Sequence, residues 1–556
     1  MKILGFALAI ALFVLCLAVM RTNPVSAQNP SQGSSRPEVN QAVHFDISPP
    51  LRELVKNNPI QPRYGFHQAE PVLYPKLAHL MMSVGRGRAI DGAIQKMILP
   101  KVGVNAGLNL LGVGVGFPGY SVPDAPPDVN LAVGTTQVVE WVNVSYAVFN
   151  KTTGAVELGP IEGNQIWAGF GGQCQNDNDG DPIAQWDKIA QRWVLTQNVF
   201  SSPYETCIAV SQTSDATGSY FRYEFPQSAG FPDYPKWGVW PDAYYQSQNN
   251  FGPGGNGFVG ARPCAYDRTK MLTGDPSATQ ICFQEGTFDD SFLPGDLDSG
   301  ALPPKGEAEV FLGSIDNGNP SSSNTLYEYL FHVDFANPND STFTGGGGTM
   351  PITVSTFGLA CGGFGACIQQ KGVGDVLDSL GDRLMYRLAY VNVATAFPSA
   401  AEHQSWTVNH AVTSPTGQVG ERWYEFRSSE SSTSLMPFQQ GTFAPDTNYR
   451  WMGSIAQDKK GDMLLGYSTS SSSMYPSINI TGRVPTDSPG TMESEILMTA
   501  GTGSQIDTAN RWGDYTSMAL DSQDYCTFWY TAEYYQSTGT FAWSTRLGAF
   551  RFPSCN

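Results

Sequence analysis

The polar and apolar positions of this chain follow the two-residue period of β-strands over most of its length. From about residue 108 onward, short apolar runs alternate with turns rich in Gly, Pro, Asn and Ser, which is typical of many short strands joined by loops. Residues 139–158 and 184–197 have the form of hairpins. We therefore predict an all-β domain over residues 108–556.

One short pattern recurs along this region: a Pro- or Gly-rich loop, an Asp or Arg, and then an apolar strand. It occurs at residues 126–134, 180–197, 240–247, 293–300, 379–393, 448–458 and 510–521. Recurrence at intervals of about 50 to 85 residues is typical of propeller or solenoid arrays. In a propeller each repeat is a four-stranded sheet, and the innermost strands surround a central channel. The pattern favours a single β-propeller of seven four-stranded blades, closed by a strand near the start of the domain.

Two other architectures remain open. Rings of six or eight blades also fit the uneven spacing of the repeats, and two β-sandwiches in tandem would account for the strands. Tandem sandwiches do not explain why the same loop, acidic residue and strand recur in order, so the propeller is the preferred prediction.

The N-terminus has the features of a secretory signal peptide. Lys2 precedes an apolar run that ends at Met20, and residues 25–27 (Val-Ser-Ala) form a small-residue cleavage site. We predict that residues 1–27 are removed; the alternative is an uncleaved membrane anchor.

Residues 28–107 are expected to form an N-terminal extension in front of the propeller domain. Residues 28–60 are rich in Gln, Ser, Pro and Asn, a composition typical of flexible segments. Residues 75–100 carry a helix-like apolar pattern between prolines, which a Gly-Arg-Gly-Arg run interrupts.

Charge and cysteine content restrict the partners and the compartment. The chain has 50 acidic and 32 basic residues, a net charge of −18, so it lacks the basic patch that nucleic acids require. No Gly-rich phosphate loop opens a helix, so no nucleotide cofactor is expected. Cys16 lies in the signal peptide, and eight cysteines remain, an even number that suits an oxidising compartment. We expect a secreted monomer, extracellular or periplasmic.

Pairing the cysteines with their neighbours in sequence predicts four disulfides. They are Cys174–Cys207, Cys264–Cys282, Cys361–Cys367 and Cys526–Cys555. Because no two cysteines have C-x-x-C spacing, a zinc site or thioredoxin-like chemistry is not expected.

Acidic residues stand near the beginnings of the predicted innermost strands, with arginines beside some of them. The acids are Asp128, Asp181, Asp242, Asp296, Asp382 and Asp514, and the arginines are Arg383, Arg450 and Arg511. Hydrolysis of a glycoside needs two carboxyl groups across the bond, one protonated and one charged, and crowding of acids raises their pKa values. We take four as candidate catalytic residues: Asp181, Asp242, Asp382 and Asp514. The alternative is structural, because Asp often caps a turn.

Arginines and aromatic side chains supply the candidate substrate contacts. Arginine binds carboxylates or sulfates through two parallel hydrogen bonds, and aromatic faces stack on sugar rings. The candidates are Arg383, Arg450, Arg511, Trp240 and Tyr386. Packing between blades also uses aromatic side chains, so a core role for Trp240 and Tyr386 is the alternative.

One polar loop has the composition of a calcium site. Residues 175–181 read Gln-Asn-Asp-Asn-Asp-Gly-Asp, and hard cations favour several oxygen ligands in a tight turn. We expect Asp177, Asp179 and Asp181 to bind calcium. The loop lacks the terminal Glu of an EF-hand, and a polar turn without metal is the alternative.

Several stretches resemble known groups of propellers. Residues 214–221 (SDATGSYF) approximate the Asp-box turn of sialidase-type propellers, a structural hairpin turn. The stretches LDSLGDRLMYRLAYVN, RWYEFR and RWGDYTSMALD resemble an uncharacterised family of large secreted bacterial β-propeller-like proteins, over about residues 120–555. This resemblance implies a propeller and brings no activity with it.

Two hypotheses about function follow. The first is a secreted carbohydrate-active enzyme, a glycoside hydrolase that uses paired Asp carboxylates on the channel face. A sialidase would need three arginines on a carboxylate and a Tyr/Glu nucleophile, and the spacing of Arg383, Arg450 and Arg511 does not establish that set. The second is a non-catalytic, calcium-stabilised propeller that binds a glycan or protein at the cell surface.

Overall fold

Strands dominate the structure, as predicted for an all-β chain. The computed structural model describes residues 36–60, 73, 91–120, 125–227, 230–298, 300–314, 323–363, 365–393, 403–429, 434–507 and 509–555. The predicted signal peptide lies outside these residues, as does most of the helix expected over 75–100, and residues 91–100 contain no helix. The α-helices among the described residues are short: α2 (Leu51–Asn57), α4 (Gly172–Asn176) and α5 (Arg268–Thr273).

Most strands fall into groups of four that are consecutive in the chain and antiparallel. The first group is β4 (Val129–Val133), β5 (Gln137–Val142), β6 (Ser145–Asn150) and β7 (Val156–Glu162). The second is β8 (Ile183–Asp187), β9 (Arg192–Val199), β10 (Glu205–Ser211) and β11 (Tyr220–Pro226). The third is β12 (Phe231–Val239), β13 (Tyr244–Gly252), β14 (Asn256–Tyr266) and β15 (Thr279–Cys282).

Two further groups share one nine-stranded sheet, because β16 and β23 pair in parallel. One contains β16 (Leu293–Leu297), β17 (Glu309–Gly313), β18 (Ser323–His332) and β19 (Thr342–Thr344). The other contains β23 (Met385–Asn392), β24 (Gln404–Thr413), β25 (Val419–Ser428) and β26 (Met436–Phe443). The strand β20 (Pro351–Leu359) pairs with β18 and β24, and β21 (Ala366–Gln369) pairs with β22 (Val376–Asp378). The expectation of separate four-stranded sheets is wrong here, since a parallel pair joins two groups.

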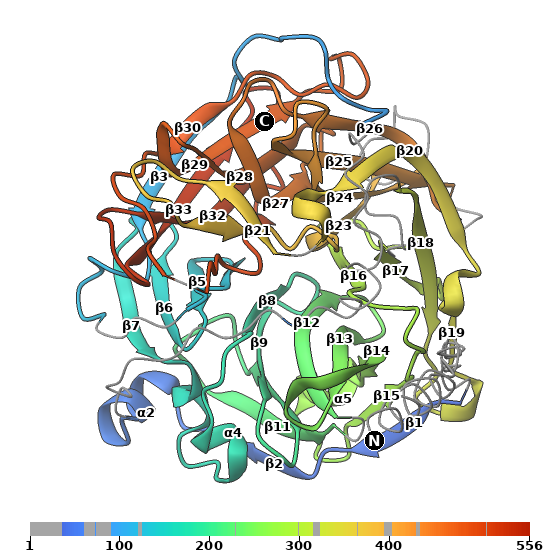
Figure 1. Cartoon of the computed structure of the whole chain (residues 1–556). Helices are drawn as coiled ribbons and strands as arrows, with labels where there is room; N and C mark the ends of the chain where they lie inside the picture. The colour runs from blue at the N-terminus through green and yellow to red at the C-terminus, as the bar shows by residue number, and fades with distance from the viewer. Residues whose placement is uncertain are drawn as a thin grey trace, which may run out of the picture. The chain divides into compact units, whose positions relative to one another are not determined.

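The C-terminal groups include a strand from the N-terminal side of the chain. One sheet is β27 (Tyr449–Gln457), β28 (Met463–Ser471), β29 (Met474–Arg483) and β30 (Ile496–Thr499). The other is β31 (Ser517–Leu520), β32 (Thr527–Tyr535), β33 (Trp543–Arg551) and β3 (Asn105–Leu111). The pairing of β3 with β33 joins segments from opposite ends of the domain, which agrees with the predicted closing strand (Figure 1).

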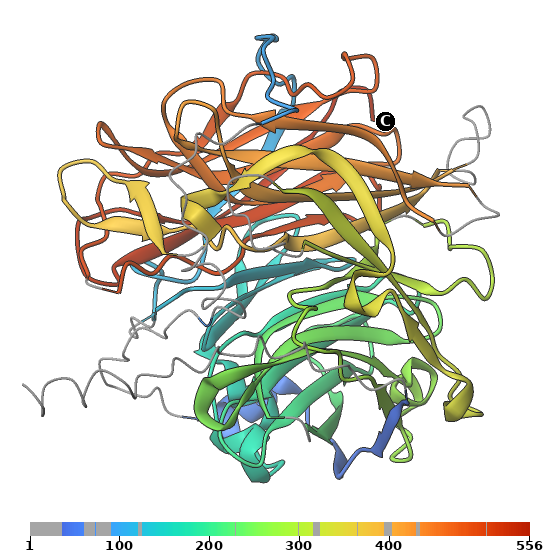
Figure 2. The ribbon, with the colours of Figure 1, turned by 45° about the vertical axis from the view of Figure 1, so that its right-hand side comes forward.

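The first strand of each group is an inner strand: β4, β8, β12, β16, β23, β27 and β31. Each inner strand contacts the next one in chain order, and β31 returns to contact β4. Figures 1 and 2 show the sheets arranged around these strands. Six of the seven recurrent stretches contain an inner strand; residues 240–247 instead form the turn after β12 and the start of β13.

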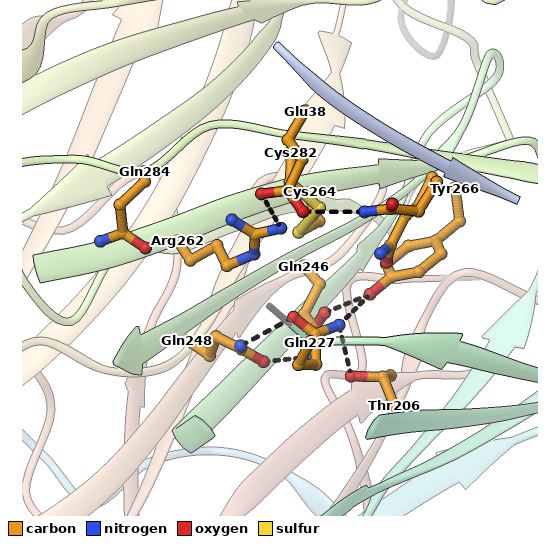
Figure 3. Close-up of a disulfide and its surroundings, with 12 residues drawn as sticks. Glu38, Thr206, Gln227, Gln246, Gln248, Arg262, Cys264, Tyr266, Cys282 and Gln284 are labelled. Atoms are coloured by element: carbon orange, nitrogen blue, oxygen red, sulfur yellow. Dashed lines mark hydrogen bonds and ion pairs between the residues drawn. A yellow bond between two sulfur atoms is a disulfide. The ribbon is translucent and has the colours of Figure 1, made fainter. Parts of the chain in front are cut away.

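The N-terminal extension adds strands to two of the sheets. β1 (Glu38–Gln41) pairs with β15, and β2 (His44–Ile47) pairs with β11. Residues 28–60, for which we expected flexibility, therefore include two strands and helix α2. Glu38 of β1 also accepts a hydrogen bond from the buried Arg262 at 2.9 Å, beside the disulfide of β14 and β15 (Figure 3).

The structure joins the cysteines in the four predicted pairs, Cys174–Cys207, Cys264–Cys282, Cys361–Cys367 and Cys526–Cys555. Four disulfides are consistent with an extracellular protein. Within the described part of the chain, no helix has the length and apolar character needed to cross a bilayer.

Removing a disulfide should cost stability in proportion to the loop that it closes. Cys264 and Cys282 are 18 residues apart, while Cys361 and Cys367 are 6 apart. We expect Cys264→Ser/Cys282→Ser to lower the free energy of unfolding by about 3 kcal/mol and Cys361→Ser/Cys367→Ser by about 2 kcal/mol, because the longer loop loses more entropy when it is closed. Urea unfolding of both double variants measures these losses, and the reverse order would contradict the loop argument.

Candidate functional site

Charged side chains meet where several inner strands begin. We call this set the central cluster, and it comprises Asp128, Asp181, Asp233, Tyr234, Lys236, Asp382, Arg383, Arg511, Asp514 and Tyr515. Most members are buried, whereas Asp233 and Asp514 are partly exposed. Solvent therefore reaches the cluster at these two residues, and the side chain of Asp514 is 15% exposed.

The backbone takes an unusual conformation at each of these beginnings. Residues with left-handed dihedrals, φ between 41° and 58°, lie just before or near the start of every inner strand: Asp128, Asp181, Tyr234, Ser291, Leu380, Met452 and Asn510. This conformation is uncommon for residues other than Gly and costs about 1 kcal/mol or more each. In β12 and β27 it coincides with a shift of register.

Lys236 is the fully buried cation of the cluster. Its Nζ lies 3.4 Å from the ring centroid of Tyr234 and 4.0 Å from that of Tyr515, and it donates to the carbonyl of Pro235 at 3.0 Å. Aromatic faces attract a cation most strongly when water is excluded. Burial lowers the pKa of Lys236 to about 8, although nearby acids, Asp181 first, act in the opposite direction.

Burial raises the pKa values of four of the cluster's acids: Asp128, Asp181, Asp233 and Asp382. Burial raises the pKa of Asp128, and the Asp514 and Asp181 carboxyl groups add to this effect. Burial also raises the pKa of Asp181, although Lys236 opposes it. Asp181 Oδ2 accepts from the amide of Tyr234 at 3.1 Å. The cluster therefore presents carboxyl groups that hold protons more tightly than free Asp.

Three consecutive amides fix the loop that carries Arg511 and Asp514. The amide of Trp512 donates to Asp378 Oδ1 at 3.0 Å, that of Gly513 to Glu533 Oε1 at 2.6 Å, and that of Asp514 to Asp128 Oδ1 at 2.7 Å. Arg511 Nη1 lies 2.9 Å from Asp378 Oδ2 and 2.7 Å from Asp514 Oδ1. Acids from three separate segments thus hold this loop in place.

Arg383 is held by its neighbour in sequence. Its Nε and Nη2 donate to the two oxygens of Asp382 at 2.8 and 3.0 Å, and its guanidinium lies 4.7 Å from the ring centroid of Tyr234. Nη2 also donates to the carbonyl of Leu73 at 3.4 Å. Arg383 therefore adds a second cation at the Tyr234 ring.

The cluster unites many of the residues proposed from sequence. Asp181, Asp382 and Asp514 of the candidate catalytic set belong to it, together with Arg383 and Arg511. The ring of Tyr386 lies 6.2 Å from that of Tyr515, and its hydroxyl accepts from Gln185 at 2.7 Å, so it borders the cluster.

Other candidates lie elsewhere, because their strands leave the centre. Asp242 is exposed in the β12–β13 turn and accepts from the Tyr245 hydroxyl at 3.2 Å. Arg450 is paired with Glu495 at 2.7 Å and Asp446 at 2.8 Å. Trp240 is buried in the core with its ring 4.7 Å from that of Tyr390. Asp242, Arg450 and Trp240 therefore lie outside the central cluster.

Asp296, also noted as an acid at a strand beginning, belongs to a different buried group. It lies 2.6 Å from Arg387, which pairs with Asp298 at 2.7 Å. A small cavity of about 10 Å³ adjoins this group, lined in part by Lys188, Asp296 and Arg387. Its volume is about that of one water molecule, so it holds no larger ligand.

The three acids expected to share a calcium ion do not converge. Asp177 Oδ2 accepts from Ser201 Oγ at 2.5 Å, and Asp179 Oδ2 accepts from the amide of Phe200 at 2.9 Å. Asp181 has turned into the central cluster through its left-handed backbone. Among the described residues, their oxygens do not form a group within metal-binding distance.

Sequence reasoning missed Lys236, Tyr234, Asp233 and Asp378. A signal existed for the first three, because an acid and a lysine interrupt the apolar stretch FPDYPKWGV of β12. Charged residues inside a buried strand are rare unless they are paired. Asp378 lies at the end of the short strand β22, and nothing in its spacing connects it with Arg511.

No family model and no curated protein matches this chain. Solved structures with a propeller-like resemblance include a Hadza microbial sialidase, with a TM-score of 0.31 and 11% identity over 77% of this chain and 75% of that one. The WD40 domain of SCAP from fission yeast has a TM-score of 0.30 and 7% identity, over 75% and 82%. A protein of unknown function from Dyadobacter fermentans has a TM-score of 0.25 and 9% identity, over 81% and 99%. At these TM-scores, none of the likenesses carries an argument about activity.

The buried lysine should give the protein a pH dependence with a defined sign. Folding lowers the pKa of Lys236 from 10.5 to about 8, so the unfolded chain binds the extra proton between these values. The free energy of unfolding should therefore rise with pH in this window, by about 2 kcal/mol between pH 8 and 9.5. Lys236→Met should lack this rise.

Chemical denaturation at pH 7.5, 8.5 and 9.5 measures the difference between the two proteins. The exposed Lys56→Met on α2 serves as the control, because it removes the same charge in solvent. If the free energy of unfolding depends on pH in the same way in the wild type and in Lys236→Met, the pH dependence does not come from Lys236.

Proposed function

We propose that the chain is a secreted carbohydrate-active protein, a glycoside hydrolase that acts on an anionic sugar at the central cluster of a seven-bladed β-propeller. The closed order of contacts among the inner strands supports the seven blades. The observation that carries the enzymatic proposal is the convergence of Asp128, Asp181 and Asp514 with Lys236 and Arg511.

The acids have the properties that glycoside hydrolysis requires. Asp181, whose pKa is raised by burial, would donate a proton to the oxygen of the leaving group. Asp514, ion-paired with Arg511 and partly exposed, would supply the carboxylate that activates water or attacks the sugar. The separation of the two carboxyl groups in a substrate complex would distinguish inversion from retention.

The cations favour a substrate that carries negative charge. Lys236, Arg383 and Arg511 meet at one end of the inner strands, although the chain as a whole is acidic. Arginine and lysine side chains bind carboxylate or sulfate groups, and here three of them stand among the five aspartates of the cluster. Tyr234 adds a buried hydroxyl that accepts or donates no hydrogen bond within the described structure, and a bound sugar would satisfy it.

A second function is favoured by the pairing of the arginines. Arg383 is saturated by Asp382, and Arg511 by Asp378 and Asp514. Arginines that are neutralised in this way suit a non-catalytic propeller, in which the charges hold the inner strands in place. Such a propeller would bind a glycan or protein at the cell surface. The two functions differ in whether loss of Asp181 or Asp514 abolishes product formation.

A hydrolysis screen on uronic-acid, sulfated and sialylated glycans tests the proposal. Asp181→Asn and Asp514→Asn should each lower kcat/KM by about 100-fold or more, since each removes a proton donor or a reacting carboxylate. The exposed Asp242→Asn should retain activity, because it removes an equivalent acid outside the cluster. As Asp181 must be protonated, the rate should fall as pH rises above its raised pKa.

Two other outcomes of the screen would argue against hydrolysis at the central cluster. Product release that survives both substitutions would exclude the central cluster as the active site. Binding of an anionic glycan without product release, lost in Lys236→Met, would establish the non-catalytic function.

A further inference from the structure

A second group of acids lies on β10, β11 and the turn after α4, away from the central cluster. Glu205 is the first residue of β10, and Glu224 lies on β11 directly opposite Cys207. Both are more than nine-tenths buried, at 8% and 7% exposure. Asp177 follows α4 and acts electrostatically on Glu205. Two acids from neighbouring strands thus face each other, and the charge of a third acts on Glu205.

The two glutamates face each other without a neutralising partner between them. Their carboxyl groups lie within hydrogen-bonding distance of one another, yet Oε2 of each is buried and has no hydrogen-bond partner. The half-exposed His44 lies beside the pair, with its Nδ1 3.9 Å from Glu224 Oε2. Facing buried carboxylates repel unless a proton or a cation lies between them.

The residues around the pair exclude a thiolate ligand, and Gly172 leaves the side of Glu224 uncovered by a side chain. Oxygens of Glu205 and Glu224 and Cys174 Sγ lie within 4.8 Å of one another, but Cys174 is bonded to Cys207 and offers no thiolate. Gly172, at φ 66°, adjoins the site; a Cβ there would lie 3.2 Å from Glu224 Oε2. A side chain at position 172 would fill the space beside the carboxyl group.

We propose that Glu205 and Glu224 bind a calcium ion, and that the negative charge of Asp177 favours its binding from outside the ligand set. Carboxylate oxygens without a thiolate form the donor set that Ca²⁺ prefers, and water supplies its remaining ligands. The ion would connect β10 with β11, beside the Cys174–Cys207 disulfide. Of the three acids expected from sequence to bind calcium, only Asp177 acts on this pair, through its charge.

Calcium titration of the mature protein after treatment with EDTA tests the site directly. Calorimetry should show one ion bound, and Tm should rise by about 2–4 °C at a hundredfold excess over Kd, because the ion binds only the folded chain. Glu205→Gln/Glu224→Gln should abolish both effects. Glu53→Gln, which removes an exposed carboxylate from α2, should leave them unchanged.

Two single substitutions test the same site if the double variant does not fold. Asp177→Asn should weaken calcium binding by about tenfold while the protein stays folded. Gly172→Ala should also weaken it, since the added Cβ lies against Glu224.

Three results would overturn the proposal. If the wild-type protein binds no calcium while Glu205→Gln has a higher Tm, Glu205 and Glu224 share a proton instead of an ion. Stabilisation by Zn²⁺ but not Ca²⁺, lost in His44→Ala, would assign a transition-metal site. Calcium binding that survives the double substitution would place the ion elsewhere.

Discussion

The burial of charged side chains near the starts of the inner strands is the constraint on which the structure depends. Lys236, Arg383 and Arg511 are almost completely buried, and an uncompensated buried charge costs several kcal/mol. Each cation is tolerated because acids lie beside it: Arg383 pairs with its neighbour Asp382, whereas Lys236 and Arg511 lie beside acids from other segments. A shift of β12 would therefore separate Lys236 from these acids.

The same constraint explains how the fold and the candidate site are connected. Left-handed residues precede or interrupt the inner strands, and they direct Asp128 and Asp181 to a common centre. The loop of Arg511 and Asp514 reaches this centre because carboxyl groups accept its successive amides. A cluster so constrained is preorganised, and preorganised charge is what catalysis of glycoside hydrolysis and selective binding of anions both use.

Sequence reasoning reached the features that local pattern determines. Strand alternation and the recurrent loops predicted the all-β fold, and the disulfides followed from chain neighbours such as Cys264 and Cys282, which lie on adjacent strands. Asp181, Asp382, Arg383, Arg511 and Asp514 were recognised because acids and arginines recur at strand beginnings. Each of these patterns is visible within a short stretch of the sequence.

The remaining features depend on contacts between distant segments. Asp242 lies in the turn between β12 and β13. The inner strand of that group is β12, which precedes the recurrent stretch at residues 240–247. The pattern therefore predicted the wrong end of the strand for Asp242. The parallel pairing of β16 with β23 joins strands that are separated in the chain by β17 to β22. No local sequence pattern indicates this pairing. The environment of Lys236 depends on the ring of Tyr515, which lies far from β12 in the chain.

The most direct test of the central cluster as a ligand site is an NMR titration of the lysine side chains, with Lys236 assigned through Lys236→Met. The account predicts one lysine that titrates near pH 8, whose resonance moves when an acidic sugar such as a uronic or sialic acid is added. If every lysine titrates above pH 10, Lys236 is not buried as described. If the Lys236 resonance is unchanged by all acidic sugars, the central cluster is not a site for anionic sugars.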